Sequence, residues 1–144
     1  MRVPMRWREI PQHYRLEGSK CIECGKVYFP PKLVCPICHS TSLEKIFLPR
    51  KGKVVTFTTV RVAPKTFELY VPYTVALIEL EGGTRLTAQL TDCDPSEIYI
   101  GMPVETIIRR INTEGKTGPI FYCYKFRPEL GSMTTDRSKA SSEP

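Results

Sequence analysis

Five segments within residues 52–127 of the 144-residue chain are hydrophobic over the length of a β-strand, and turn-forming residues separate them. In the second segment, Ala76, Ile78 and Leu80 occupy one set of alternate positions, and Val75 and Leu77 fall on the other set. Successive side chains of a strand point to opposite faces, so this alternation predicts a strand with one buried face. The five predicted strands are residues 54–62, 73–80, 85–90, 104–111 and 120–126.

The connections between these strands indicate the topology. Residues 63–72, 81–83 and 112–119 hold prolines or glycines typical of loops and turns. Between the third and fourth strands, Asp94 is a natural helix N-cap, Pro95 suits the first helical position and Gly101 can end the helix. Five strands with a short helix between the third and fourth follow the order of an OB-fold, a partly open Greek-key barrel. We therefore predict a mostly β fold built on a five-stranded OB-fold barrel.

Val75 and Leu77 lie on the second face of the predicted barrel strand. A small barrel that is covered by another element buries such residues against that element, whereas an uncovered barrel presents them to a partner protein. The sequence favours packing within the chain and leaves docking of a partner open.

The residues before the first cysteine have a helical pattern. Trp7, Ile10, Tyr14 and Leu16 recur near helical spacing, and Pro11 interrupts the pattern. We expect a short helix, a kink and a second helical turn.

Four of the six cysteines form two C-x-x-C pairs, Cys21 with Cys24 and, after ten intervening residues, Cys35 with Cys38. Two such pairs joined by a short hairpin supply four thiolates at the tetrahedral spacing that Zn²⁺ accepts. Four protein sulfurs close the coordination shell, so we predict one structural zinc per chain rather than a catalytic metal. A ribbon of about 30 residues buries too little apolar surface to fold alone, and the metal substitutes for a core there.

Disulfides, a redox pair and rubredoxin-type iron are the other interpretations of these cysteines. Disulfides need an oxidising compartment, but the N-terminus lacks the apolar run of a signal peptide, so we expect a cytoplasmic protein without a membrane segment. A thioredoxin-like pair opens a helix, whereas residues 27–31 suit a ribbon and its turn. Iron uses the same four sulfurs, and the sequence leaves zinc and iron open. His39 follows Cys38, and we expect it at the surface because four cysteines already fill the shell.

The predicted organisation follows from these segments and from the end of the chain, where residues 132–144 hold almost no hydrophobic residue. Such a composition predicts a disordered tail. The expected units are an N-terminal helical segment, a zinc ribbon, an OB-fold barrel and the tail, at residues 1–20, 21–50, 51–131 and 132–144.

The distribution of charge bears on the choice of partner. The chain has 21 Lys/Arg and 15 Asp/Glu, a formal net charge of +6. Residues 1–50 carry nine basic and four acidic residues, whereas residues 51–131 carry ten and nine. A barrel close to neutrality is a poor binder of nucleic acid, because affinity for phosphate backbones comes mainly from many cationic contacts. Strand aromatics such as Tyr73 and Tyr124 still offer stacking surfaces, so a nucleic-acid-binding zinc-ribbon/OB-fold protein stays the alternative function.

The sequence offers little for catalysis by the chain itself. It has two histidines, His13 and His39, and no G-x-S-x-G, H-E-x-x-H or glycine-rich phosphate loop. Cys93 lies between two aspartates, whose charge disfavours a thiolate, and Cys123 alternates with aromatic residues as a small buried hydrophobe would. We expect both thiols to be structural and the chain not to be an enzyme.

Several motifs carry a resemblance. Residues 7–10, Trp-Arg-Glu-Ile, and the cysteine-rich segment 21–38 resemble the rubredoxin-knuckle zinc ribbon of the acyl-CoA-associated OB-fold family, long catalogued as a domain of unknown function. Residues 72–83 and 100–105 resemble the second-strand and post-helix motifs of its barrel. The resemblance covers roughly residues 5–130 and is greatest to archaeal members that accompany acetoacetyl-CoA thiolase and hydroxymethylglutaryl-CoA synthase.

The resemblance implies a non-catalytic scaffold that holds the thiolase and the synthase side by side. Acetoacetyl-CoA would pass between their active sites through a shared region that binds coenzyme A, in the mevalonate pathway of isoprenoid synthesis. A scaffold leaves the uphill free energy of the condensation unchanged, but it raises the effective concentration of the intermediate at the next enzyme. Arg61 and Lys65 are cationic candidates for the coenzyme A phosphates, and because no motif singles them out, the contact residues stay unassigned.

Overall fold

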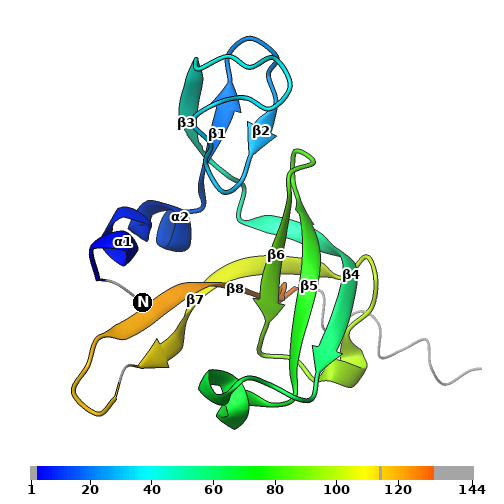
Figure 1. Cartoon of the computed structure of the whole chain (residues 1–144). Helices are drawn as coiled ribbons and strands as arrows, with labels where there is room; N and C mark the ends of the chain where they lie inside the picture. The colour runs from blue at the N-terminus through cyan, green and yellow to red at the C-terminus, as the bar shows by residue number, and fades with distance from the viewer. Residues whose placement is uncertain (1–2, 114, 132–144) are drawn as a thin grey trace, which may run out of the picture.

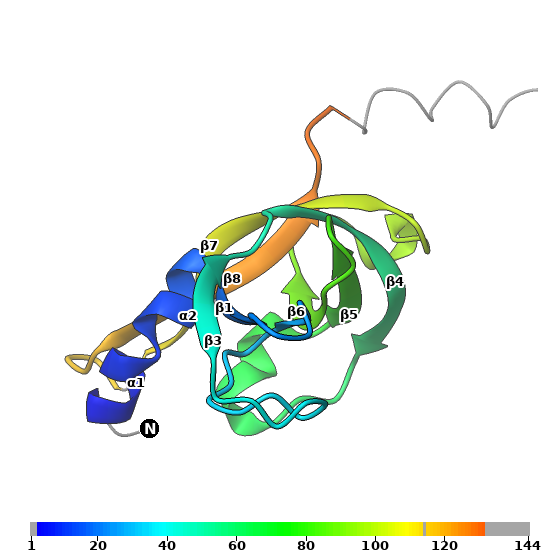
Figure 2. The ribbon, with the colours of Figure 1, turned by 90° about the horizontal axis from the view of Figure 1, so that it is seen from above.

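The computed structural model describes residues 3–113 and 115–131, and the tail predicted at 132–144 lies outside these residues. Two short helices, a three-stranded ribbon and a closed five-stranded barrel follow one another along the chain (Figure 1). The ribbon stands over one end of the barrel, and the helices lie beside strands β7 and β8 (Figure 2). This architecture confirms the predicted mostly β class with an N-terminal ribbon and an OB-fold barrel.

The N-terminal segment forms two helices, α1 (Val3–Arg8) and α2 (Ile10–Arg15), as the pattern predicts. Pro11 lies in the first turn of α2, where its missing N–H removes no helical hydrogen bond. Leu16 ends α2 in the left-handed conformation, with φ 52°, and its side chain is buried in the core. The turn at Leu16 therefore directs the chain from the helices into the ribbon.

The ribbon is an antiparallel sheet in the order β2-β1-β3, formed by β1 (Glu17–Cys21), β2 (Val27–Tyr28) and β3 (Leu43–Phe47). The glycine of β1, Gly18, permits close strand pairing, because a Cβ there would lie 2.7 Å from the carbonyl oxygen of Tyr28. Phe29 then reaches the barrel, where its ring meets that of Tyr124 edge to face at 5.6 Å between centroids. The ribbon is thus packed against the barrel through an aromatic contact.

The barrel has the order β4-β5-β6-β8-β7 and closes through β4 and β7. Neighbouring strands are antiparallel except β6 and β8, which are parallel. Its strands are β4 (Lys51–Val60), β5 (Tyr73–Leu80), β6 (Arg85–Leu90), β7 (Pro103–Thr113) and β8 (Ile120–Pro128).

The helix predicted between the third and fourth barrel strands is a single 3-10 turn, η2 (Pro95–Glu97). Asp94 holds the N-cap position and Pro95 the first turn, as the sequence predicts. The turn is short because Ile98 returns to extended backbone and packs its buried side chain into the core.

The connection from β4 to β5 contains a second 3-10 helix, η1 (Lys65–Tyr70), which the turn residues of the sequence do not reveal. Its Phe67 ring lies 5.7 Å from Tyr73 and 6.4 Å from Tyr70, measured between centroids. These aromatic contacts hold η1 against the start of β5.

Residues of the predicted dry face fill the barrel interior. Ala76, Ile78 and Leu80 are almost completely buried, around the fully buried ring of Phe126. On the opposite face of β5, Leu77 lines a cavity with Phe29 and Pro30 of the ribbon. The second face of β5 is therefore turned toward the ribbon at Leu77.

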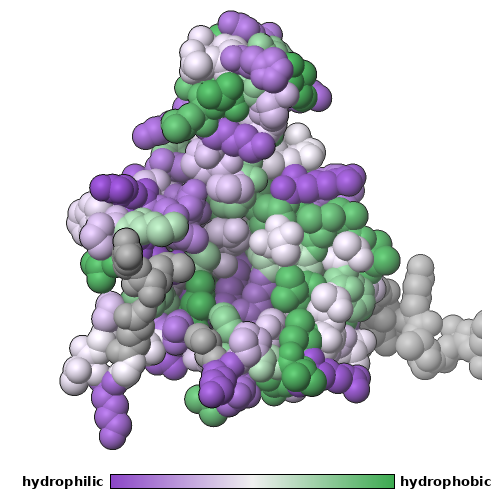
Figure 3. Space-filling view, in the orientation of Figure 1, coloured by the Kyte–Doolittle hydropathy of each residue, from purple (hydrophilic) through white to green (hydrophobic). Residues whose placement is uncertain are grey.

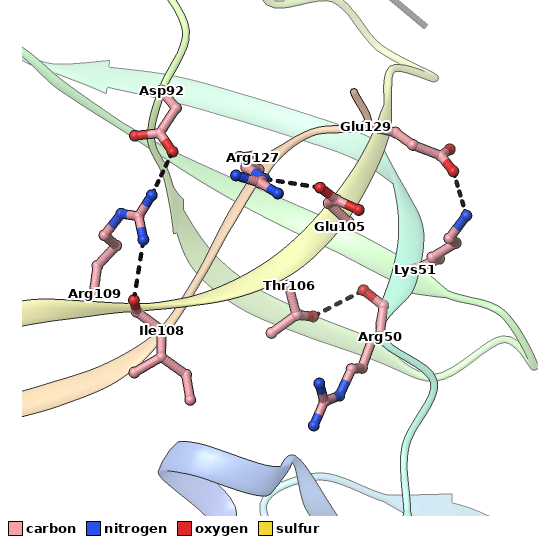
Figure 4. Close-up of polar contacts among 9 residues, drawn as sticks. All are labelled: Arg50, Lys51, Asp92, Glu105, Thr106, Ile108, Arg109, Arg127 and Glu129. Atoms are coloured by element: carbon pink, nitrogen blue, oxygen red, sulfur yellow. Dashed lines mark hydrogen bonds and ion pairs between the residues drawn. The ribbon is translucent and has the colours of Figure 1, made fainter. Parts of the chain in front are cut away.

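Ion pairs and a polar contact join the strands near the closure of the barrel (Figure 4). Arg127 Nε lies 2.7 Å from Glu105 Oε1 between β8 and β7, and Lys51 pairs with Glu129. Thr106 Oγ1 donates to the carbonyl oxygen of Arg50 at 2.9 Å. Ion pairs that keep contact with solvent contribute about 0–1 kcal/mol each, so the closure depends mainly on the backbone ladder and the core.

Candidate metal centre

The four predicted ligand sulfurs come together at the tip of the ribbon. The Sγ atoms of Cys21, Cys24, Cys35 and Cys38 all lie within 4.8 Å of one another. Cys21 Sγ is 3.4 Å from Cys38 Sγ, and Cys24 Sγ is 3.5 Å from Cys35 Sγ. A zinc–sulfur bond of 2.3 Å in a tetrahedron places sulfurs about 3.8 Å apart, so this donor set fits Zn²⁺. A metal in such a shell would have no open position for a water or a substrate.

Two knuckles with the same backbone hydrogen bonds present these sulfurs. In the first, the N–H of Cys21 donates to the carbonyl of Lys26, and the N–H of Gly25 donates to the carbonyl of Cys21, both at 2.9 Å. In the second, Cys35 donates to Ser40 at 2.9 Å, and His39 donates to Cys35 at 3.0 Å. The spacing of donors and acceptors is identical, which makes the two knuckles structural repeats.

His39 takes the place in the second knuckle that Gly25 has in the first. Both adopt left-handed backbone, with φ 56° at His39 and φ 70° at Gly25. Glycine reaches this region without strain, and histidine is among the other residues enriched there. The side chain of His39 is exposed, which agrees with the expected surface position.

Hydrogen bonds at Cys35 favour the thiolate that a metal needs. The backbone N–H of Cys38 and the hydroxyl of Tyr28, 3.3 Å from Cys35 Sγ, lower the pKa of this thiol to about 5. Cys21 and Cys35 are fully buried, whereas Cys24 and Cys38 are exposed. Tyr28 is a polar neighbour of the site that cysteine spacing alone does not identify.

The two spare thiols lie in the barrel half, away from this cluster in sequence. Burial raises the pKa of Cys93 and of Cys123, so both favour the neutral thiol. Cys123 Sγ contacts His13 Nδ1 at 3.2 Å, and His13 Nε2 contacts Glu9 Oε2 at 3.3 Å. This chain of contacts anchors α2 on β8, and sequence reasoning misses it because His13 and Cys123 are 110 positions apart.

The fold and the four-sulfur cluster define a class of protein in which a rubredoxin-like zinc ribbon precedes an OB-fold barrel. Two family models match the chain: "ChsH2, rubredoxin-like zinc ribbon domain" at residues 8–44 and "ChsH2, C-terminal OB-fold domain" at residues 46–109. The chain belongs to the ChsH2/DUF35 family.

The relatives whose names state a role fall into two groups. A "DUF35 domain-containing scaffold protein" of Methanocaldococcus jannaschii is 51% identical over 123 residues, which are 85% of this chain and 87% of the relative. A "Benzoylsuccinyl-CoA thiolase subunit BbsA" of Thauera aromatica is 29% identical over 112 residues, 78% of this chain and 75% of the relative. The family thus includes proteins named as scaffolds and proteins named as subunits of acyl-CoA enzymes.

A solved structure extends the similarity to three dimensions. The matched chain of the "Ltp2-ChsH2(DUF35) aldolase" superposes with a TM-score of 0.70 at 32% identity, covering 89% of this chain and 95% of that chain. By its name, that structure contains a DUF35 protein together with an aldolase. Separately, no helix in the described part of this chain is long and apolar enough to cross a membrane.

Proposed function

We propose that this protein is a non-catalytic scaffold, held together by one structural zinc, that bridges acetoacetyl-CoA thiolase and hydroxymethylglutaryl-CoA synthase. In this role it supports transfer of the acyl-CoA intermediate in the mevalonate pathway of isoprenoid synthesis. The observation that carries the proposal is the 51% identity, over most of both chains, to a protein named as a DUF35 scaffold. The thiolase subunit among the relatives supports an acyl-CoA enzyme as one partner.

The surface of the molecule suits a bridge with more than one contact. Trp7 on α1, Leu33 on the ribbon and Leu69 on η1 expose 74%, 89% and 96% of their surfaces. These elements lie at the side, the top and the bottom of the molecule as drawn in Figure 1, so the three exposed apolar residues belong to separate parts of the structure. Scattered apolar residues also occur on monomeric proteins, and here their separation supports the proposal without carrying it.

The metal-clamped ribbon and the closed barrel also suit this role on energetic grounds. A partner that binds ordered elements immobilises few new degrees of freedom, so less of the interaction free energy is lost on association. Holding two enzymes together raises the local concentration of the shared intermediate, with no new chemistry from the scaffold. Exposed Arg61 and Lys65, in the connection between β4 and β5, are cationic residues available to coenzyme A bound to a partner.

Reconstitution from purified components tests the bridge. The thiolase and the synthase from the source organism are mixed with and without the zinc-loaded full chain, and complexes are sized by gel filtration with light scattering. We expect a ternary complex in the presence of the chain and separate enzymes in its absence. Enzymes that associate equally well without the chain, or a chain that binds neither, would reject the bridging role.

A competition assay then tests transfer of the intermediate. An added 3-hydroxyacyl-CoA dehydrogenase with NADH consumes acetoacetyl-CoA that escapes into solution, and NADH oxidation reports the escape. We expect the chain to reduce this escape without changing the equilibrium constant of the condensation. A chain that binds random single-stranded nucleic acid tightly at high salt, and neither enzyme, would instead support the nucleic-acid alternative.

A further inference from the structure

Lys125 on β8 is a largely buried lysine whose side chain has no hydrogen-bond or ion-pair partner among the described residues. Its side chain is 8% exposed, next to the core residue Phe126. Within residues 3–113 and 115–131, the ammonium makes no hydrogen bond or ion pair, and its described contact is the ring of Tyr70, with Nζ 5.8 Å from the centroid. A cation–π contact replaces only part of the hydration that burial removes. No fully buried side-chain nitrogen of the described residues lacks a hydrogen-bond partner, so Lys125 Nζ keeps contact with solvent in the adjoining cavities, where it can donate hydrogen bonds to a ligand.

Two cavities meet at this lysine. One, of about 190 Å³, lies between Tyr70, Thr91 and Lys125, and the other, of about 180 Å³, extends from Lys125 toward Phe67. Gln89 of β6 lines both cavities together with Lys125. A recessed hydrophilic area is visible on the face that carries β6 and β8 (Figure 3). Each cavity has room for several water molecules, and so for a small oxyanion.

The charges around the cavities leave a positive excess at Lys125. The acid beside it, Asp92, is already paired with Arg109, whose Nη2 lies 2.9 Å from Asp92 Oδ2 (Figure 4). Asp92 also accepts a hydrogen bond from Thr91 Oγ1 at 3.2 Å. Burial lowers the pKa of Lys125, because loss of water disfavours the charged ammonium, and the nearby charge of Asp92 offsets only part of this effect. A bound anion would supply the missing partner.

We propose that Lys125 and Gln89 form a binding site for an oxyanion group, a carboxylate or a phosphate, of a small ligand that enters between η1 and β6. The ammonium donates charge-assisted hydrogen bonds to the anionic oxygens, and the Gln89 amide supplies a neutral donor from the next strand. Tyr70 and Phe67 of η1 form the aromatic wall that holds the rest of the ligand. This proposal does not depend on which enzymes bind the chain.

The test uses the zinc-loaded full chain with ¹³C-labelled lysine. Sodium phosphate is titrated in one arm and sodium acetate in the other, against sodium chloride at constant ionic strength, and the Cε resonances of the lysines are followed by NMR. We expect the Lys125 resonance to shift and saturate in at least one arm, while that of exposed Lys53 on β4 does not saturate. Saturation with phosphate alone assigns a phosphate ligand, and saturation with acetate alone assigns a carboxylate ligand.

Variants distinguish binding at this site from a general attraction of anions to the surface of the protein. In the variants, binding is followed through the backbone amide resonance of Thr91, which lines the cavity, because Lys125→Met has no Lys125 signal. Lys125→Met should weaken the saturable binding at least about tenfold, because a hydrogen bond to a charged group is lost, and Lys53→Met should leave it unchanged. Gln89→Leu should weaken binding by a smaller factor, and it keeps the proposal testable if Lys125→Met does not fold. Absence of saturation at Lys125 in both arms, or equal affinity of wild type and a folded Lys125→Met, would overturn the proposal.

Discussion

Removal of the metal should unfold the ribbon while the barrel stays folded. Chelation, or Cys35→Ser, takes away the cluster that holds the two knuckles together. The barrel has its own closed strand ladder and its own core, centred on Phe126. We therefore expect the ribbon, up to β3, to unfold and the barrel, from β4 onward, to stay folded.

The loss of ribbon stability without zinc can be estimated from the small part of the core that the ribbon contributes. Before β4, the hydrophobic side chains of the ribbon unit that pack against the core are Val27, Phe29 and Ile46, which are partly buried, and Leu48, which is buried. Half-burial stabilises by about 1–1.5 kcal/mol per side chain and full burial of a leucine by about 2–3 kcal/mol, so the four together supply about 6 kcal/mol. A structural zinc supplies about 10–16 kcal/mol in small zinc domains at neutral pH. The ribbon contacts are too weak to replace it.

Amide hydrogen exchange measured with and without chelator reports both regions at once. In the ribbon, the N–H groups of Cys21 and Cys35 hydrogen bond to Lys26 and Ser40, and they should exchange at nearly unprotected rates after metal removal. In the barrel, the N–H of Val54, which donates to Met102, should keep its protection. Metal analysis of the untreated protein should return about one zinc per chain, and iron in its place would identify the rubredoxin-type alternative.

Cys93→Ser is the matched control, because it changes a thiol outside the cluster and should preserve both the metal content and the ribbon protection. A metal-free protein that retains protected ribbon amides would refute the reasoning. Simultaneous loss of protection in the barrel would show that the two units unfold as one.

Two further predictions concern the barrel. Gly52→Ala places a Cβ 2.5 Å from the carbonyl oxygen of Glu79, so urea unfolding should show a loss of about 1–3 kcal/mol, whereas Gly131→Ala, with open space around it, should change stability little. Burial raises the pKa of Tyr124 from 10.0 to about 12, so its contribution to stability is complete below pH 10 and is lost as the pH rises toward 12. Between these values the wild type should lose about 1.4 kcal/mol per pH unit relative to Tyr124→Phe, and parallel pH profiles of the two proteins would contradict the assignment.

Much of the fold could be predicted from local patterns in the sequence. Alternation along β5 identified its buried face, and Asp94 with Pro95 placed the turn between β6 and β7. The spacing of the cysteines predicted a four-sulfur cluster, and the structure brings those sulfurs within 4.8 Å. These features could be predicted because each depends on residues close in sequence or on a repeated spacing.

Only the tertiary structure shows which element covers each face of a strand. Strand alternation shows which side chains share a face but not which element covers it, so Leu77 could be placed beside the ribbon only in three dimensions. The contact between His13 and Cys123 joins residues 110 positions apart, and no local spacing encodes it. Lys125 likewise reads as an ordinary strand lysine, and its burial arises from the packing of η1 and β6 around β8. Composition and spacing thus determined the strands and the cluster, whereas long-range packing determined the neighbours of each side chain and hence its chemistry.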